Sequence, residues 1–199
     1  MPCAQLFICR LINGKKRCPK YHQFVLLISY LNNKFSDIIL QPLGFSSTPL
    51  GKDRWPTRFI EADLSFKVRT SFNTKVSRIS LSFELVQSRS NHYGYSMFDL
   101  MNKIAVFIGV NLNEIRSDRQ QPQYRLRTSS LKTNITLRKY LSNYTLRSKK
   151  YLDYQDWTRI LNYFELGTHK DNKEHIAVIK SQRKQRRTVY NWDHLQITN

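Results

Sequence analysis

The clearest pattern along the chain is a strict alternation of apolar and polar residues in two neighbouring stretches, 65–72 and 78–85. Successive side chains of a β-strand point to opposite faces of the sheet, so this alternation predicts two strands, each with one apolar and one polar face. The short segment Asn73-Thr74-Lys75 separates them and predicts an antiparallel hairpin. A second, weaker hairpin is predicted over residues 112–116 and 123–128.

Apolar residues at a spacing of three or four predict amphipathic helices elsewhere. The predicted helices span residues 21–35, 56–63, 95–108, 131–144, 153–166 and 173–187. Pro56 suits the first turn of the second helix because its missing N–H would be unpaired there. The order helix, hairpin, helix, hairpin, helices predicts an α+β domain in which helices back one face of a four-stranded antiparallel sheet.

The net charge of the chain adds an expectation about its binding partner. The 199 residues include 33 Lys and Arg against 14 Asp and Glu, a net charge of +19. A folded domain with that surplus is expected to bind an anionic partner, and nucleic acid fits better than a membrane because the charge also follows the predicted strands. The longest apolar run, residues 24–28, is too short for a membrane span. Composition alone leaves open a basic protein that packs against RNA.

The polar face of the predicted sheet is strongly cationic. It would carry Lys67, Arg69, Arg78, Arg125 and Arg127 together. Such a face can enter the major groove of DNA, which is about 12 Å wide and displays a base-specific pattern of donors and acceptors. The alternative is that these are ordinary solvated residues on the outer face of a half-exposed sheet.

One segment links these patterns to a known family. Residues 55–66, WPTRFIEADLSF, resemble the signature of the LAGLIDADG homing endonucleases and maturases, in which a helix ends in acid, small residue, Asp, Gly and leads into a strand. Further segments resemble other blocks of that family and extend the resemblance over residues 11–196: 12–14 and 19–20 upstream, then 81–87, 151–157 and 187–195.

The resemblance implies the αββαββα fold, with a saddle-shaped sheet that straddles DNA, and a metal-dependent DNA endonuclease that hydrolyses phosphodiester bonds. In the family the acid that closes the signature helix binds a divalent metal, usually Mg²⁺, so Asp63 is the implied metal ligand and catalytic residue. Gln87 is implied to position water or phosphate, and Arg159 to be the basic residue of the active site.

The resemblance also implies which residues contact DNA. The expected contacts are Ser65, Lys67, Arg69, Ser71, Arg78, Ser80, Ser82, Glu84, Arg116, Gln123, Arg125, Arg127, Lys184 and Arg187.

The sequence departs from the family pattern in the signature itself. Thr57 and Arg58 stand where the family has small residues at the crossing of two signature helices, and Leu64 replaces the glycine after the acid. If position 64 needed a left-handed backbone, leucine would cost about 1–2 kcal/mol. Residues 1–54 contain no second signature. We therefore expect residues 1–53 to be an inter-repeat connector with one amphipathic helix, and residues 54–199 to be the second repeat of a double-motif protein.

Three functions stay open at this level. The first is an intron-encoded homing endonuclease that cuts a long duplex site, either degenerate or as a half-molecule completed by a second LAGLIDADG repeat from a homodimer or a separate chain. The second is an RNA-binding maturase that helps its intron to splice without cutting DNA, and the third is a truncated remnant. A mitochondrial location is the family expectation for such a protein.

Overall fold

The computed structural model describes residues 4–35, 39–71 and 78–188. The predicted turn at 73–75 and the terminal block beyond 188 lie outside these ranges. In chain order the elements are α1 (Ala4–Ile12), α2 (Lys20–Lys34), the short 3-10 helix η1 (Leu50–Lys52), α3 (Trp55–Asp63), β1 (Leu64–Ser71), β2 (Arg78–Ser88), α4 (Phe98–Ile108), β3 (Leu112–Ile115), β4 (Gln123–Arg127), α5 (Leu131–Asn143), α6 (Lys150–Glu165), η2 (Thr168–Lys170) and α7 (Lys173–Thr188).

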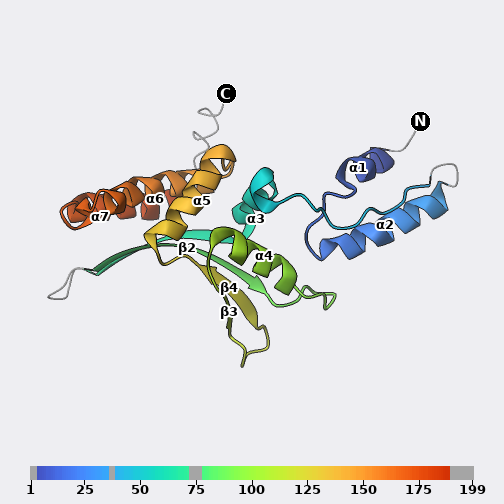
Figure 1. Cartoon of the computed structure of the whole chain (residues 1–199), viewed down its shortest axis with the longest axis horizontal. Coiled ribbons are helices and arrows are strands. Elements are labelled where there is room, and N and C mark those ends of the chain that lie inside the picture. The colour runs from blue at the N-terminus through green and yellow to red at the C-terminus, as the bar shows by residue number, and fades with distance from the viewer. Residues whose placement is uncertain (1–3, 36–38, 72–77, 189–199) are drawn as a thin grey trace.

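The four strands form one antiparallel sheet in the order β1-β2-β4-β3. Helices cover one side of this sheet and leave the other open (Figure 1). The predicted α+β architecture is therefore confirmed, and the two hairpins meet through β2 and β4, where Leu85 pairs with Leu126. None of the helices in the described ranges is long and apolar enough to cross a membrane.

The main core lies between the sheet and the helices that cover it. Phe66, Phe83 and Leu126 point from the strands toward the helices and are almost completely buried. Trp157 of α6 is fully buried and contacts the Phe66 ring at a centroid distance of 5.4 Å. The alternation in the sequence thus assigns the apolar side of each strand correctly, since this side is the one that the helices bury.

Two helices begin at other residues than the pattern predicts. The first turn of the helix expected at 95 is absent because Asn91 Oδ1 accepts from the N–H groups of Tyr93 and Tyr95, both at 3.0 Å, and holds this segment in a turn. α4 begins only at Phe98, whose N–H donates to Ser96 Oγ. By contrast α6 begins at Lys150, almost a turn earlier than expected.

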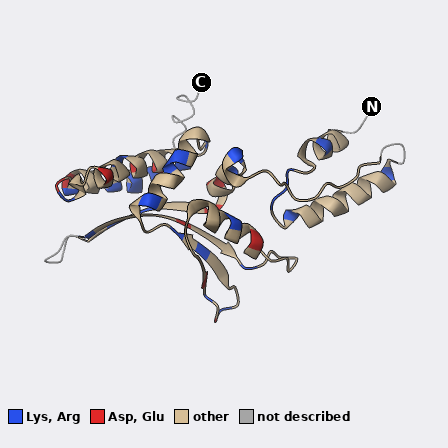
Figure 2. Cartoon of the chain, in the orientation of Figure 1, with Lys and Arg blue, Asp and Glu red and all other residues tan. Residues whose placement is uncertain are grey.

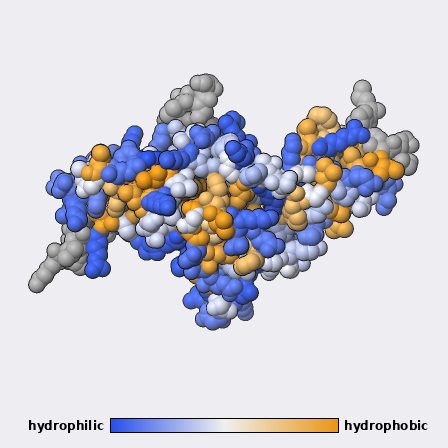
Figure 3. Space-filling view, viewed as in Figure 1, coloured by the Kyte–Doolittle hydropathy of each residue, from blue (hydrophilic) through white to orange (hydrophobic). Residues whose placement is uncertain are grey.

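The N-terminal region forms a small helical unit of its own. α1, which the sequence pattern did not predict, packs on α2 around Leu6, Cys9 and Ile28. This unit keeps much apolar surface exposed, visible over α1 and α2 at the right of Figure 3. The exposed apolar side chains of the two helices are Phe7, Ile8 and Leu11 of α1, and Leu26, Leu27 and Tyr30 of α2.

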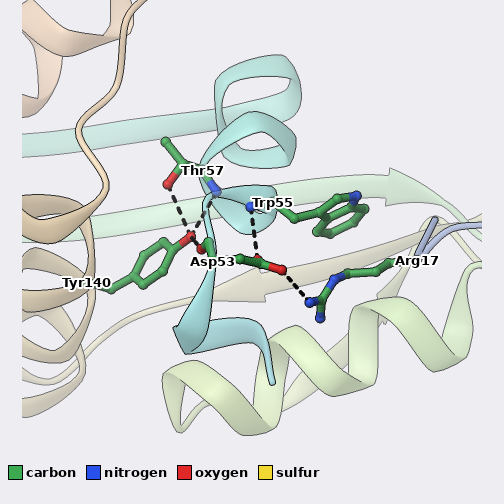
Figure 4. A network of polar contacts seen from close by, with 5 residues as sticks. All are labelled: Arg17, Asp53, Trp55, Thr57 and Tyr140. Carbon is green, nitrogen blue, oxygen red and sulfur yellow. Dashed lines mark hydrogen bonds and ion pairs between the residues drawn. The ribbon is translucent and has the colours of Figure 1, made fainter. Parts of the chain in front are cut away.

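A network of polar contacts fixes the start of α3 (Figure 4). Asp53 Oδ1 accepts from the Trp55 N–H at 3.0 Å, and its other oxygen pairs with Arg17 at 2.6 Å. The Tyr140 hydroxyl donates to the Asp53 carbonyl at 2.9 Å and accepts from the Thr57 N–H at 3.1 Å. These groups satisfy N–H groups of the first helical turn, which have no partner inside the helix. The network therefore joins α3 both to α5 and to the N-terminal unit.

Replacing Tyr140 by Phe should lower the free energy of unfolding by about 1–3 kcal/mol, because the Thr57 N–H and the Asp53 carbonyl would lose a partner in a buried place. Chemical denaturation measures this loss. Tyr93→Phe removes the same hydroxyl from a side chain that is 59% exposed and should change stability by less than about 0.5 kcal/mol. Equal effects of the two substitutions would show that the network does not stabilise the fold.

Candidate functional site

The junction between α3 and β1 has no connecting loop. Asp63 is the last residue of α3, and Leu64 is both the cap of the helix and the first residue of the strand. Leu64 has φ −92° and ψ 153°, an extended conformation that leucine adopts without strain. The cost considered for a non-glycine residue at position 64 therefore does not arise, and the exposed Asp63 carboxylate is held at the beginning of the sheet.

Asp63 and Gln87 lie on the same cavity, which has a volume of about 500 Å³. Gln87 is near the end of β2 and its position in the alternation places it on the helix side of the strand, as for Leu85. The structure thus brings together two of the three side chains that the sequence assigns to catalysis. The remaining walls come from α3, from the segment after β2 and from the start of α2, including Phe59, Ala62, Ser88, Asn91, His92 and Lys20.

Lys150 stands beside Asp63, although the family resemblance does not assign a role to this lysine. Its Nζ donates to the Ala62 carbonyl at 3.1 Å, next to Asp63 in the chain. Burial lowers the pKa of the Lys150 ammonium, while the carboxylates of Asp63, Glu61 and Asp153 raise it. In the sequence, Lys150 belongs to a Lys149-Lys150 pair that precedes a predicted helix. The pair is recognised as part of a site only once the structure shows that the helix begins at Lys150.

Glu61 holds the segment that carries Lys150. Its Oε1 accepts from two consecutive backbone N–H groups, those of Arg147 and Ser148, the second at 2.7 Å. A carboxylate that receives two N–H groups makes charge-assisted bonds, which are stronger than neutral ones. Glu61 and Asp63, both in the last turn of α3, thus make different contacts. Glu61 ties α3 to the start of α6, and Asp63 remains exposed to the cavity.

Arg159 is not brought to this cavity. It lies nine residues after the start of α6, about 14 Å along the helix axis. Its guanidinium is exposed, 3.7 Å from Asp156 Oδ1, and it lines a different groove with Tyr154, Gln155 and Thr158. Within the described part of the chain, Lys150 rather than Arg159 is the basic side chain that contacts the α3 terminus.

The open face of the sheet gathers the predicted DNA contacts from three strands. The register pairs Ser65 with Glu84, Lys67 with Ser82 and Arg69 with Ser80, and side chains paired across antiparallel strands point to the same face. Glu84 in turn pairs with Arg127 of β4. Alternation then adds the remaining members of the same face: Ser71 and Arg78 at the far end of the β1-β2 hairpin, and Gln123 and Arg125 of β4.

Not all of these side chains are equally available. Ser82 is only 3% exposed, so it lies below the surface that a ligand could touch. Glu84 forms an ion pair with Lys67 at 2.5 Å, and this pair neutralises one cation of the face. The Nε atoms of Arg125 and Arg127 are buried and have no hydrogen-bond partner in the described part of the chain. Because these Nε atoms are themselves buried, they are not accessible to a ligand on the open face.

The other three predicted contacts lie away from the middle of the sheet. Arg116 is exposed where β3 ends and has φ 55°, a left-handed conformation that few residues other than glycine adopt. Lys184 is an exposed residue of α7 and lines a groove next to β1. Arg187 is in the last turn of α7, and its side chain lies outside the described part of the chain.

The profile of the LAGLIDADG endonuclease family matches residues 58–161, about half of the chain, from the signature helix to α6. The chain belongs to the LAGLIDADG endonuclease family. The identification made from the signature is thereby confirmed.

The chain is also similar in sequence to a yeast protein. The intron-encoded DNA endonuclease aI3 of Saccharomyces cerevisiae is 26% identical over 227 aligned residues, which take in 96% of this chain but 54% of the relative. The chain thus spans about half the length of that relative.

Solved structures show the same fold. The homing endonuclease I-TnaI superposes on 72% of this chain with a TM-score of 0.54 and 21% identity, and 92% of its own chain is covered. The LAGLIDADG homing endonuclease I-GzeII, solved with its DNA target, matches 76% of this chain with a TM-score of 0.56 and 21% identity, but only 50% of its own chain is covered. The meganuclease I-SmaMI bound to DNA gives the same coverage at 19% identity.

The donor atoms around Asp63 suit a hard divalent cation only in part. The described residues contain no cluster of three or more His, Cys, Asp or Glu side chains that could hold a metal. Mg²⁺, however, keeps several waters and commonly takes one or two carboxylates together with substrate phosphates. Asp63, with the Gln87 amide oxygen on the same cavity, therefore fits such a site when phosphates supply further oxygens.

Replacing Glu61 by Gln should lower the free energy of unfolding by about 1–2 kcal/mol, because the two N–H groups would lose a charged acceptor. Amide NMR should show the largest shifts at Arg147 and Ser148. Glu114→Gln breaks an exposed ion pair with Arg89 and should cost less than about 1 kcal/mol. Unchanged Arg147 and Ser148 amides in the Glu61 variant would contradict the assignment.

Proposed function

We propose that this chain is one LAGLIDADG half of an intron-encoded homing endonuclease. In this proposal it binds duplex DNA on the open face of its sheet and hydrolyses a phosphodiester bond at Asp63 with a divalent metal, Mg²⁺. The observation that carries the proposal is the junction at residues 63–64, which places an exposed carboxylate directly at the first residue of a strand whose open face is cationic. Binding and cleavage residues are thereby built on one rigid unit.

Duplex DNA matches the open face in charge and in chemistry. Arg69, Arg125 and Arg127 offer guanidinium groups, which make two parallel hydrogen bonds to the acceptors of guanine in the major groove. Gln123 and Ser80 on the same face can donate and accept, as mixed base sequences require. Figure 2 shows the basic residues that follow the strands. Sequence preference would therefore come from the sheet and general affinity from the net charge of +19.

The side chains around the cavity would divide the catalytic work. Asp63 would hold the metal ion, with the Gln87 amide orienting a water or a phosphate oxygen. When bound, the ion supplies a more acidic water and stabilises the departing oxygen. Lys150, whose Nζ donates to the carbonyl beside Asp63, would contact the scissile phosphate, while Glu61 keeps Lys150 in place through residues 147–148.

A second half is needed for cleavage of both strands. Arg54, the cap residue before α3, and Arg58 and Ala62 of the helix are exposed and lie four residues apart, which places them on one side of the helix. Thr57, by contrast, is 3% exposed and donates to the Tyr144 carbonyl at 3.0 Å, so it packs within this half. Of the two departures at the helix crossing, only Arg58 would thus meet a partner helix. The exposed apolar side chains of α1 and α2 offer further surface for a second half.

Asp63→Asn should abolish cleavage and leave DNA binding within about twofold of the unchanged protein, because the amide keeps the shape but loses the charge that a metal requires. The assay is relaxation or linearisation of a plasmid that carries the intron insertion site, with Mg²⁺ present, and binding is measured in parallel. Asp171→Asn removes the same charge from an exposed residue after η2 and should cut normally.

Two results would contradict the proposal. One is intact plasmid under conditions in which the unchanged protein binds it. The other is cleavage by the Asp63 variant at the rate of the unchanged protein. A stronger affinity for the host intron RNA than for the duplex would favour a maturase that acts in splicing.

A further inference from the structure

A second cationic surface lies at the outer edge of the sheet. β1 is an edge strand, paired only with β2 in the four-stranded sheet, and an edge strand leaves a row of backbone N–H and C=O groups unpaired. α7 runs beside this edge, and the two elements enclose an open groove of about 920 Å³. One wall is formed by residues 65–70 of β1 and the other by Ala177, Lys180, Ser181, Arg183 and Lys184 of α7.

Arg183 fixes α7 to the strand and forms the floor of this groove. It is only 6% exposed, and its guanidinium donates to the Phe66 carbonyl at 2.8 Å and to Asp153 of α6 at 3.2 Å. Arg186 likewise forms an ion pair with the buried Asp156 of α6. The acids of α6 therefore neutralise the two arginines that hold the helix pair together.

Among the other cations of the groove, Lys67 pairs with Glu84, but Arg69, Lys180 and Lys184 are not neutralised in this way. Lys180 donates to the Thr70 hydroxyl at 2.8 Å, a neutral partner that leaves its charge uncompensated. For Arg69, Lys180 and Lys184 the described part of the chain contains no ion pair. Arg69 also belongs to the open face, so the groove is continuous with the proposed DNA-binding surface.

We propose that this groove binds phosphates of the DNA backbone beside the segment that lies on the open face, so that α7 lengthens the footprint of the protein. The inference rests on the proposed function, since it presumes that DNA occupies that face. Lys180 and Lys184 are one helical turn apart, about 6 Å along the axis. Successive phosphates of one strand advance about 3.4 Å along a duplex, so the two lysines span about two phosphates.

The lining favours a duplex backbone over a single strand. Proteins that bind single-stranded nucleic acid stack the bases on aromatic side chains. The one aromatic residue on this groove, Phe66, is 3% exposed and packs in the core. The remaining side chains are cations, small hydroxyl residues, Val68 and Ala177, which contact phosphates and sugars rather than base faces.

The test compares two double variants of the full chain on a 40-base-pair duplex of arbitrary sequence, titrated at several salt concentrations. Lys180→Gln with Lys184→Gln should weaken binding by about tenfold and reduce the slope of log K against log salt by about 1.8, because about 0.9 is lost for each phosphate contact. Lys139→Gln with Lys170→Gln removes two exposed lysines that do not line the groove, and should change affinity by less than about threefold. Equal thermal melting of the variants controls for folding.

The outcomes separate this inference from the proposed function. If the unchanged protein does not bind the duplex, the proposed function fails and the groove with it. If it binds but the two double variants behave alike, the groove proposal is overturned while the sheet remains the DNA-binding surface. If the groove variant loses affinity for a single-stranded RNA of 40 nucleotides but not for the duplex, the groove serves RNA and the proposal is wrong.

Discussion

The absence of a loop between α3 and β1 is the constraint on which the site depends. A helix that passes directly into a strand fixes the Asp63 carboxylate relative to every side chain on the open face. The polar network of Asp53 and Tyr140 then fixes the other end of the same helix, and Glu61 fixes the segment of α6 that carries Lys150. Three contacts at the two ends of a nine-residue helix thus set the position of the cavity and of the sheet.

Several acidic residues of the described part of this basic protein stabilise its interior contacts. Asp53, Asp153 and Asp156 each pair with an arginine that joins two elements, and Glu84 restrains Lys67 on the sheet. Because these acids pair with the cations that join elements, most other cations of the open face and of the α7 groove have no acidic partner in the described part of the chain. The net charge of +19 is therefore unevenly distributed between paired and unpaired cations. Arg17, Arg183 and Arg186, which hold elements together, are neutralised, whereas Arg69, Lys180 and Lys184 form no ion pair in the described part of the chain.

The sequence predicts the sheet and most helices because their apolar residues repeat with the period of the element that buries them. It places Asp63 and Gln87 correctly at the ends of their elements, and the structure adds that they share one cavity. It does not predict where α6 begins, because the segment just before this helix is bonded to Glu61, which is 86 residues away in the chain. The sequence does not indicate Lys150 for the same reason, and the family motif around Arg159 fixes its neighbourhood but not its distance from Asp63.

Some side chains cannot be judged from the sequence at all. Alternation places Ser82 on the open face, yet it is nearly buried, since a small residue in an interior strand lies below its longer neighbours. Thr57 occupies a position of the signature that predicts a contact with a partner helix, but its hydroxyl bonds within its own half. Exposure depends on how neighbouring elements pack, and a one-dimensional pattern does not contain this information.

The most direct measurement is a crystal structure of the full chain with a duplex that spans its intron insertion site, grown with a divalent metal. Our account predicts that Arg69 and Arg125 enter the major groove and that a carboxylate oxygen of Asp63 lies about 2.1 Å from an Mg²⁺ ion that also contacts a backbone phosphate. A duplex seated on the helices that cover the sheet, or an Asp63 remote from every phosphate, would contradict it.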